Sequence, residues 1–144
     1  MKNILATIDF YGSEKLVIDK AYEIAKAFDA KIWLLHVVAP EPEFVGFGVG
    51  PQYVRDARAT ELKKEHSMIN QYAGELKLQG VEAEGLLLQG STIEMIMTEA
   101  EKLKIDLIVT GHHDHNFVYK AFYGSVASGV INKTKIPVLL VPLE

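Results

Sequence analysis

With 144 residues, 49% of them hydrophobic and 24% charged, the chain is long enough to bury one core and suits a single domain over residues 1–144. Its formal net charge of −4 argues against nucleic acid as the main partner, because such a partner needs a basic face. Since the chain has no Cys, a disulfide framework, a thiolate zinc site and a thiol nucleophile are excluded.

The sequence carries no sign of a membrane protein. No apolar run approaches the roughly 20 residues of a membrane span. The opening segment MKNILATID lacks the long apolar core and the cleavage site of a signal peptide. We therefore expect a cytoplasmic protein that does not contact a membrane.

The first part of the chain alternates short apolar runs with amphipathic stretches. Residues 3–8 (NILATI) read as a buried strand. Ser13 is predicted to cap a helix over 14–28, whose apolar face recurs at helical spacing and comprises Leu16, Val17, Ala21, Ile24, Ala25 and Phe28. A second buried strand follows at 31–38 (KIWLLHVV), where His36 is interpreted as a hydrogen-bonded core histidine rather than a ligand.

A long loop comes next. Residues 39–52 (APEPEFVGFGVGPQ) combine Pro, Gly and aromatic residues, and a loop of this length suggests a function. Phe44, Phe47 and the adjoining Tyr53 are compatible with covering a bound base, and equally with packing on the domain or on a partner.

The rest of the chain continues the same alternation of elements. The pattern predicts a helix at 53–79, a strand at 81–89, a helix at 92–104, a strand at 106–111, a helix at 124–134 and a strand at 136–143. The helix at 124–134 is expected to bury Val126, Val130 and Ile131, whereas His66, among charges on the long helix, is expected to be exposed.

Strands that alternate with helices and are apolar on both faces predict an α/β fold, with a parallel five-stranded sheet between two layers of helices. Ligands of such sheets bind at the carboxyl ends of the strands, where the strand order reverses. Asp9, Val37, Val38 and Gly111 are therefore candidate site residues. Periodicity does not decide which strands flank the reversal.

The segment 110–126, TGHHDHNFVYKAFYGSV, has the features of an anion site. Gly111 allows the backbone to approach a ligand closely. Gly124, Ser125 and Val126 open a helix whose N–H groups suit a phosphate. The same spacing also fits an ordinary strand-to-helix loop with a glycine turn and a serine N-cap.

This segment resembles the signature of the universal stress protein family, G-x-x-G-x(9)-G-[S/T], with Gly111, position 114 and Gly124-Ser125 in register. MKNILATID, LLHVV, GSTIEMIMTEAEKLKIDLIVTG and GSVASGVINKTKIPVLLVPLE resemble further segments of the family, so the resemblance covers the whole chain. It implies a Rossmann-like, adenine nucleotide alpha hydrolase-like fold with sheet order 3-2-1-4-5. The crevice would then lie between Asp9 and Gly111.

The resemblance also implies a function and a site. It implies a regulatory or stress-response domain that binds ATP or a related adenine nucleotide without a Walker lysine. Matching positions would line the adenine (Thr7, Val37), the ribose and phosphates (Asp9), the ribose (Thr110, Gly111) and the phosphates (Gly124, Ser125, Val126).

Asp114 departs from the family signature, which has glycine at this position. A carboxylate about 4 Å from a phosphate charge costs roughly 4 kcal/mol at an effective dielectric of 20. A Mg²⁺ ion bound with the nucleotide by Asp9 and Asp114 would offset this repulsion. The alternative is a homodimeric stress protein that binds no nucleotide and acts through protein partners.

His112, His113, Asp114 and His115 form a cluster of possible metal ligands. Adjacent residues of an extended loop point in opposite directions, and no distant pair of ligands completes a tetrahedral set. The competing interpretations are a solvated loop and histidines that contact phosphate. His113 and Asp114 therefore belong to the candidate nucleotide-binding set.

The sequence shows no catalytic constellation. It has no G-x-S-x-G elbow and no evident base–orienter pair for Ser125. Any ATP hydrolysis is expected to be slow and incidental.

The last strand predicts an assembly. IPVLLVPLE is long and apolar, and in the implied order it is an edge, which invites pairing with another chain. The family resemblance implies that this strand pairs across a two-fold axis. We predict a homodimer through Ile136 to Pro142.

Overall fold

The computed structural model describes residues 1–10, 12–38, 52–89, 92–112 and 125–143. Its strands are β1 (Asn3–Thr7), β2 (Lys31–Val38), β3 (Ala83–Gln89), β4 (Leu107–His112) and β5 (Val138–Pro142). Its helices are α1 (Glu14–Phe28), α2 (Gln52–Leu78), α3 (Thr92–Lys102) and α5 (Ser125–Lys133). Every element predicted from the sequence is present, with ends that differ by at most two residues.

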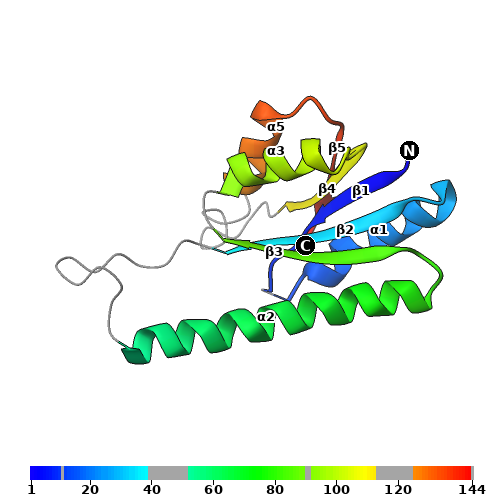
Figure 1. Ribbon diagram of the computed structural model, residues 1–144. Helices are drawn as coiled ribbons and strands as arrows, with labels where there is room; N and C mark the ends of the chain where they lie inside the picture. Colours follow the sequence, from blue (N-terminus) through cyan, green and yellow to red (C-terminus); the bar gives the residue numbers. More distant parts are fainter. Residues whose placement is uncertain (11, 39–51, 90–91, 113–124, 144) are drawn as a thin grey trace.

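The five strands form one parallel sheet in the order β3-β2-β1-β4-β5 (Figure 1). This confirms both the predicted α/β fold and the strand order that the family resemblance implied. Within the described residues, no helix combines the length and the hydropathy that crossing a membrane requires.

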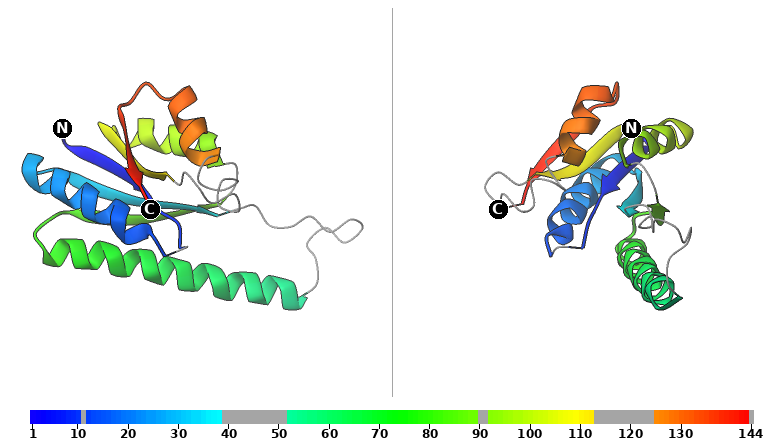
Figure 2. Two further views of the ribbon diagram at one scale, coloured as in Figure 1. Left: turned by 180° about the vertical axis from the view of Figure 1, so that it is seen from behind. Right: turned by 90° about the vertical axis from the view of Figure 1, so that its left-hand side faces the viewer.

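Helices cover both faces of the sheet (Figure 2). One face packs against α1 and α2, and the other against α3 and α5. Successive strand residues enter the two cores in turn because their side chains point to opposite faces. Ile4, Leu34 and Val109 face α1 and α2, while Leu5, Leu35 and Ile108 face α3 and α5.

Three apolar residues that the periodicity placed on buried helix faces are exposed instead. Leu16, Phe28 and Ile131 have exposed fractions of 47%, 57% and 47%. Helix α1 turns a narrower stripe toward the sheet than predicted, formed by Val17, Ile18, Ala21 and Ala25. Leu16 and Phe28 lie outside that stripe. His66 is exposed, as expected.

The start of α1 differs in detail from the prediction. Ser13 occupies the N-cap position, but its side chain makes no capping hydrogen bond. Glu14 Oε2 instead accepts a hydrogen bond of 3.0 Å from the Gly12 backbone N–H. Gly12 has a φ of 99°, which only glycine adopts readily. The turn between β1 and α1 is thus held by the first side chain of the helix.

Asp106 joins the amino ends of β1 and β4. Its Oδ2 accepts hydrogen bonds from the backbone N–H groups of Lys2, at 2.8 Å, and Asn3, at 3.0 Å. These two bonds lower the pKa of Asp106 because they stabilise its ionised form. The carboxylate therefore ties β1 to β4 at the edge opposite the expected site.

Candidate functional site

The strand order reverses between β1 and β4, because β1 pairs with β2 on one side and with β4 on the other. Thr7 ends β1, and Thr110 lies near the end of β4. The Thr7 hydroxyl donates a hydrogen bond of 2.7 Å to the Thr110 hydroxyl. This hydroxyl pair bridges the two strands at the point where ligands of such sheets bind.

Thr7 and Thr110 share one face of the sheet. They follow Leu5 and Ile108 by two residues, so both point toward the side covered by α3 and α5. Val37 packs against the same core. The structure therefore places three of the predicted site residues on one face, at the carboxyl ends of adjacent strands.

The hydroxyl pair retains a donor for a ligand. Thr110 is only 3% exposed, and a buried hydroxyl needs a hydrogen-bond partner. Each threonine supplies one hydrogen and two acceptor lone pairs. Whichever hydroxyl donates to the other, one hydrogen of the pair is left for a further acceptor.

Asp9 follows β1 at the predicted edge and is half-buried. The backbone on its amino side is fixed from two directions. The Ile8 N–H donates to the Leu35 carbonyl at 2.8 Å, and the Ile8 carbonyl lies 2.9 Å from His36 Nδ1. The peptide that leads into Asp9 is therefore held by β2.

The structure confirms His36 as a hydrogen-bonded core histidine. Besides its bond to Ile8, its ring meets the Phe10 ring at 63°, with centroids 4.7 Å apart. Its Nε2 lies 3.5 Å from Glu65 Oε2 on α2. The sequence analysis did not identify Glu65. Its position could have been noticed in the sequence, because Glu65 is an acidic residue within the apolar stripe of α2 that contains Leu62 and Ile69.

Gly111 has a packing role that the sequence analysis missed. A Cβ at this position would lie 2.6 Å from Leu143 Cδ1. Leu143 is held there because its N–H donates to the His112 carbonyl at 3.0 Å. The absence of a side chain on Gly111 thus lets the chain after β5 close over the end of β4.

Helix α5 begins at Ser125, within one residue of the predicted start, with Val126 in its first turn. Because β4 and β5 are parallel, the helix that connects them runs back along the sheet, and its N-terminus lies toward the carboxyl ends of the strands. A Cβ on Gly129 would lie 2.6 Å from Ile93 Cδ1 and Cγ1. The small residue allows α5 to pack closely against α3, which fixes the position of its N-terminus.

Several predicted site residues lie outside the described residues. They are His113, Asp114, His115 and Gly124, together with most of the 39–52 loop. His112 ends β4 and is half-buried. Among the residues that the structure describes, no group of three His, Asp or Glu side chains could hold a metal ion.

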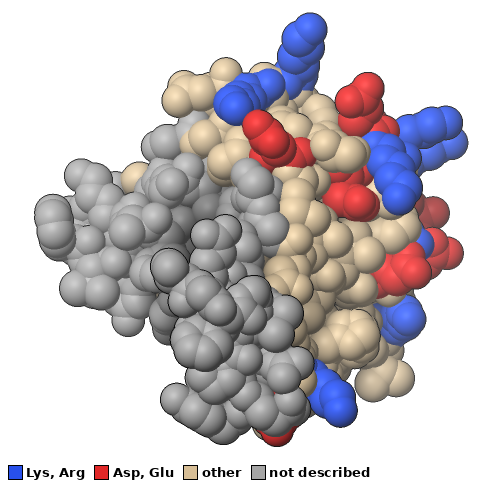
Figure 3. Space-filling model, turned by 60° about the vertical axis from the view of Figure 1, so that its left-hand side comes forward, with Lys and Arg blue, Asp and Glu red and all other residues tan. Residues whose placement is uncertain are grey.

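Charges of both signs are interspersed over the described part of the face in Figure 3. Lys and Arg side chains alternate there with Asp and Glu rather than forming a broad basic patch. This distribution agrees with the net charge of −4.

Comparison with known protein families identifies the family of this chain. The model of the universal stress protein family matches residues 1–142. The chain belongs to the universal stress protein family. The Thr7–Thr110 pair between β1 and β4 therefore lies within a universal stress protein domain.

Universal stress proteins from Thermus aquaticus and Coxiella burnetii match along nearly their whole length. A relative from Thermus aquaticus, the universal stress protein in QAH/OAS sulfhydrylase 3′ region, is 31% identical over 141 residues, which cover 97% of this chain and 98% of the relative. Universal stress protein A homolog 1 of Coxiella burnetii is 29% identical over 140 residues, which cover 97% of this chain and 95% of the relative.

Solved structures of universal stress proteins share this fold. UspA from Lactobacillus plantarum has a TM-score of 0.79 at 20% identity and 97% coverage of each chain. A complex of the Archaeoglobus fulgidus protein with dAMP has a TM-score of 0.64 at 20% identity and 98% coverage of each chain. An Arabidopsis thaliana family member with AMP bound has a TM-score of 0.68 at 19% identity, covering 99% of this chain and 92% of that one.

Proposed function

We propose that this universal stress protein binds an adenine nucleotide at the carboxyl ends of β1 and β4. The observation that carries the proposal is the Thr7–Thr110 hydroxyl pair at 2.7 Å, which lies at the reversal of strand order and keeps one hydrogen for an acceptor. Relatives with the same fold have been crystallised with dAMP and with AMP. The expected consequence is a regulatory protein whose state reports the nucleotide.

The roles of the site residues follow from their chemistry. Val37 offers an apolar wall for the base, and the Asp9 carboxylate accepts hydrogen bonds from ribose hydroxyls. The backbone N–H groups at Ser125 and Val126 suit phosphate because they lie at the N-terminus of α5. Gly111, His113 and Gly124 complete the nucleotide set in this proposal.

The preferred ligand in this proposal is ATP with Mg²⁺. Asp9 and Asp114 would hold the ion together with the phosphates, since carboxylate and phosphate oxygens are usual magnesium ligands. The ion would offset the repulsion between Asp114 and a triphosphate. Nucleotides with fewer phosphates would depend less on magnesium.

Calorimetric titration of the nucleotide-free protein with ATP and with AMP tests the proposal. We expect micromolar ATP binding that requires Mg²⁺. Asp114→Gly should remove that requirement and raise ATP affinity in the absence of Mg²⁺ by up to about three decades, the equivalent of roughly 4 kcal/mol. Asp19→Asn, an exposed change on α1, is the control. No binding of either nucleotide up to millimolar concentration would refute nucleotide binding.

The second candidate function is a homodimer that acts through protein partners without nucleotide. Asp114 in the phosphate signature favours it. Strand β5 is an edge of the sheet, and Leu140 on it is 38% exposed. We propose pairing through Ile136 to Pro142.

Light scattering at micromolar concentration tests the homodimer. The wild type should have the mass of two chains, and Leu140→Lys should have the mass of one, because it places a charge in the paired strand. Leu78→Lys, at a residue 90% exposed at the end of α2, should leave the dimer intact. A wild-type monomer would exclude this assembly.

A further inference from the structure

The loop that carries Asp9 is held from the side of the sheet opposite the threonine pair. His36 Nδ1 lies 2.9 Å from the carbonyl of Ile8, which follows β1. Its Nε2 lies 3.5 Å from Glu65 Oε2 on α2. The side chains of His36 and Glu65 are 13% and 19% exposed. A chain of contacts thus runs from α2 through the imidazole to the peptide before Asp9.

The geometry of these contacts favours a proton between His36 and Glu65. A carbonyl oxygen only accepts, so Nδ1 must carry the hydrogen that bonds to Ile8. In a neutral imidazole, Nε2 then presents a lone pair, and it would face a carboxylate oxygen that also only accepts. Glu65 Oε2 is buried and makes no hydrogen bond within the described residues. One added proton, on Nε2 or on Oε2, replaces the repulsion between these two acceptor atoms with an attraction.

We propose that His36 and Glu65 share one proton, and that this proton positions the Ile8–Asp9 peptide and makes nucleotide affinity fall as the pH rises. His36 is a positioning residue in this scheme, because it acts on the site through Ile8. The affinity consequence rests on the proposed nucleotide site, whereas the positioning does not.

Loss of the proton disturbs the loop through the imidazole. With a lone pair on Nε2 opposite a carboxylate, the ring gains by turning away from Glu65, and the Ile8 carbonyl then loses its donor. The Ile8 carbonyl and the Asp9 N–H belong to one planar peptide, so a rotation of one moves the other.

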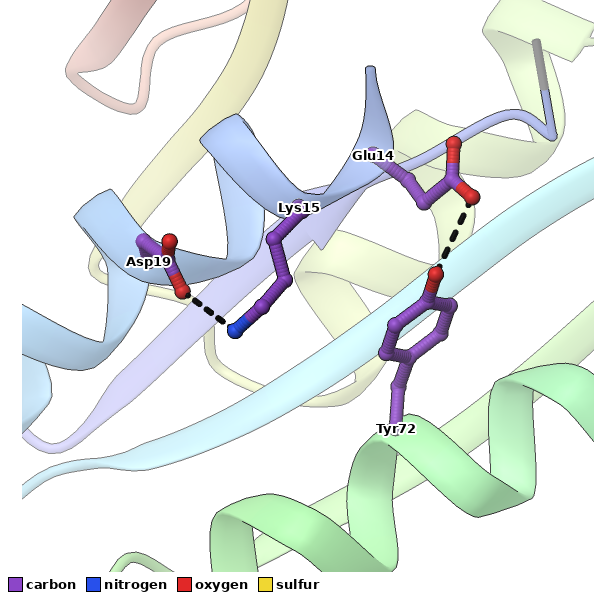
Figure 4. A network of polar contacts seen from close by, with 4 residues as sticks. All are labelled: Glu14, Lys15, Asp19 and Tyr72. Carbon is purple, nitrogen blue, oxygen red and sulfur yellow. Dashed lines mark hydrogen bonds and ion pairs between the residues drawn. The ribbon is translucent and has the colours of Figure 1, made fainter. Parts of the chain in front are cut away.

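The other ionisable groups around this loop form a separate link. Tyr72 on α2 donates a hydrogen bond of 3.0 Å to Glu14 Oε1 (Figure 4). Glu14 Oε2 in turn accepts a hydrogen bond from the Gly12 N–H. Burial, together with the bond to Glu14, raises the pKa of Tyr72 to about 12, so its phenol stays neutral near neutral pH. Phe10, which packs on the imidazole, is uncharged. Within the described residues, Glu65 is therefore the charged side chain that contacts His36.

Amide NMR of the nucleotide-free protein tests the positioning directly. Between pH 6 and 9, the Asp9 amide signal of the wild type should shift in step with the His36 ring signals. In Glu65→Gln, the amide N–H of the new side chain donates to Nε2 and keeps the Nδ1 hydrogen on Ile8, so the Asp9 signal should stay constant. Glu61→Gln, an exposed loss of the same charge on α2, should behave like the wild type.

The affinity for AMP tests the consequence. The ratio of the Glu65→Gln affinity to the wild-type affinity should be near one at pH 6 and between about two and ten at pH 8.5, the range of one hydrogen bond. Taking the ratio cancels the titration of the phosphate itself. In His36→Asn, the side-chain amide can donate to the Ile8 carbonyl and does not titrate. The ratio of the affinity of this variant for AMP to the wild-type affinity should therefore also rise with pH.

The outcomes separate the two proposals. An Asp9 amide that ignores the titration of His36, or that titrates equally in Glu65→Gln, overturns the shared proton. A constant affinity ratio beside a titrating amide overturns the link to the site. If no variant binds AMP at any pH, the proposed function fails, and the amide titration still decides the positioning.

Discussion

The two faces of the sheet differ in what they contribute. Among the residues whose side chains the structure describes, the face covered by α1 and α2 has the larger core, to which both helices give several buried residues. Within the same residues, the face covered by α3 and α5 has a smaller core that ends at the Thr7–Thr110 pair. We infer that the first face supplies most of the stability and that the second supplies the binding groups.

The polar groups on the two faces support this division. On the α1 and α2 side, the Tyr72 hydroxyl is committed to Glu14, and that link fixes the turn after β1. On the other side, the threonine pair keeps one hydrogen beyond its mutual bond. A hydroxyl whose hydrogen is bonded within the protein stabilises the fold, whereas a hydroxyl with a hydrogen left over can donate to a ligand.

The largest expected effect tests the stability of the α1 and α2 face. Ile69 on α2 is fully buried, so Ile69→Ala should lower the free energy of unfolding by about 2–5 kcal/mol. Nucleotide affinity of the folded protein should change less than twofold. Urea unfolding measures the loss. Ile96→Ala, at an equally buried residue of α3, should cost less, and a larger cost there would reverse the assignment.

A smaller effect is expected where α5 packs on α3. Gly129→Val would place its Cβ 2.6 Å from Ile93 Cδ1, so either the Ile93 side chain or α5 must shift, and we expect a shift of α5 at a cost of about 1–3 kcal/mol in unfolding free energy. AMP affinity should fall as well, because the N-terminus of α5 moves with the helix. Gly74→Val on α2, where a Cβ meets open space, is the matched control. Unchanged AMP affinity would separate α5 from the site.

Tyr72→Phe should cost about 1 kcal/mol at neutral pH, the value of one hydrogen bond. The pH dependence has a defined sign. The pKa of Tyr72 is raised from 10.0 to about 12, chiefly by burial, so between these values the folded protein keeps a proton that the unfolded chain has lost. Wild-type stability from this group is complete below pH 10 and is lost toward pH 12.

Denaturant unfolding at several alkaline pH values measures this difference. The gap in unfolding free energy between wild type and Tyr72→Phe should narrow from pH 10 to 12. Tyr22→Phe on α1 is the control, because it removes a phenol hydroxyl that is not bonded to Glu14. Parallel curves for the wild type and Tyr72→Phe would mean that the link to Glu14 does not contribute in solution.

The sequence predicted the elements and much of the carboxyl edge for a local reason. Each strand and helix can be predicted from the hydrophobic periodicity of a short segment. The alternation of strands and helices then predicts that the carboxyl ends of the strands lie at one edge of the sheet. Val37 and Gly111 therefore lie at the carboxyl ends of β2 and β4, as this alternation predicted. The hydrogen bond of His36 was also predictable, because a histidine in a buried strand needs a partner.

Other features were not predictable because they depend on how elements pack. Leu16 and Phe28 are exposed because of the rotation of α1 against the sheet, which the helical period does not set. Glu65 meets His36 only because α2 crosses β2, and Gly111 accommodates Leu143 only because β5 pairs with β4. Such pairings join residues that are distant in sequence, so no local pattern records them.

The smallest expected effect on stability belongs to the threonine pair, where the effect on binding should be largest. Thr110→Val keeps the shape of the side chain and removes a buried hydroxyl, so the unfolding free energy should change by less than about 1 kcal/mol. AMP affinity should fall about tenfold, because the hydroxyl pair no longer presents the same donor to the ligand. Calorimetry at fixed pH measures this loss, and Thr98→Val, on the exposed side of α3, is the control. A variant that loses stability but keeps its affinity would show that the pair only joins β1 to β4, as Asp106 does at the opposite edge. The two faces would then differ in core size alone.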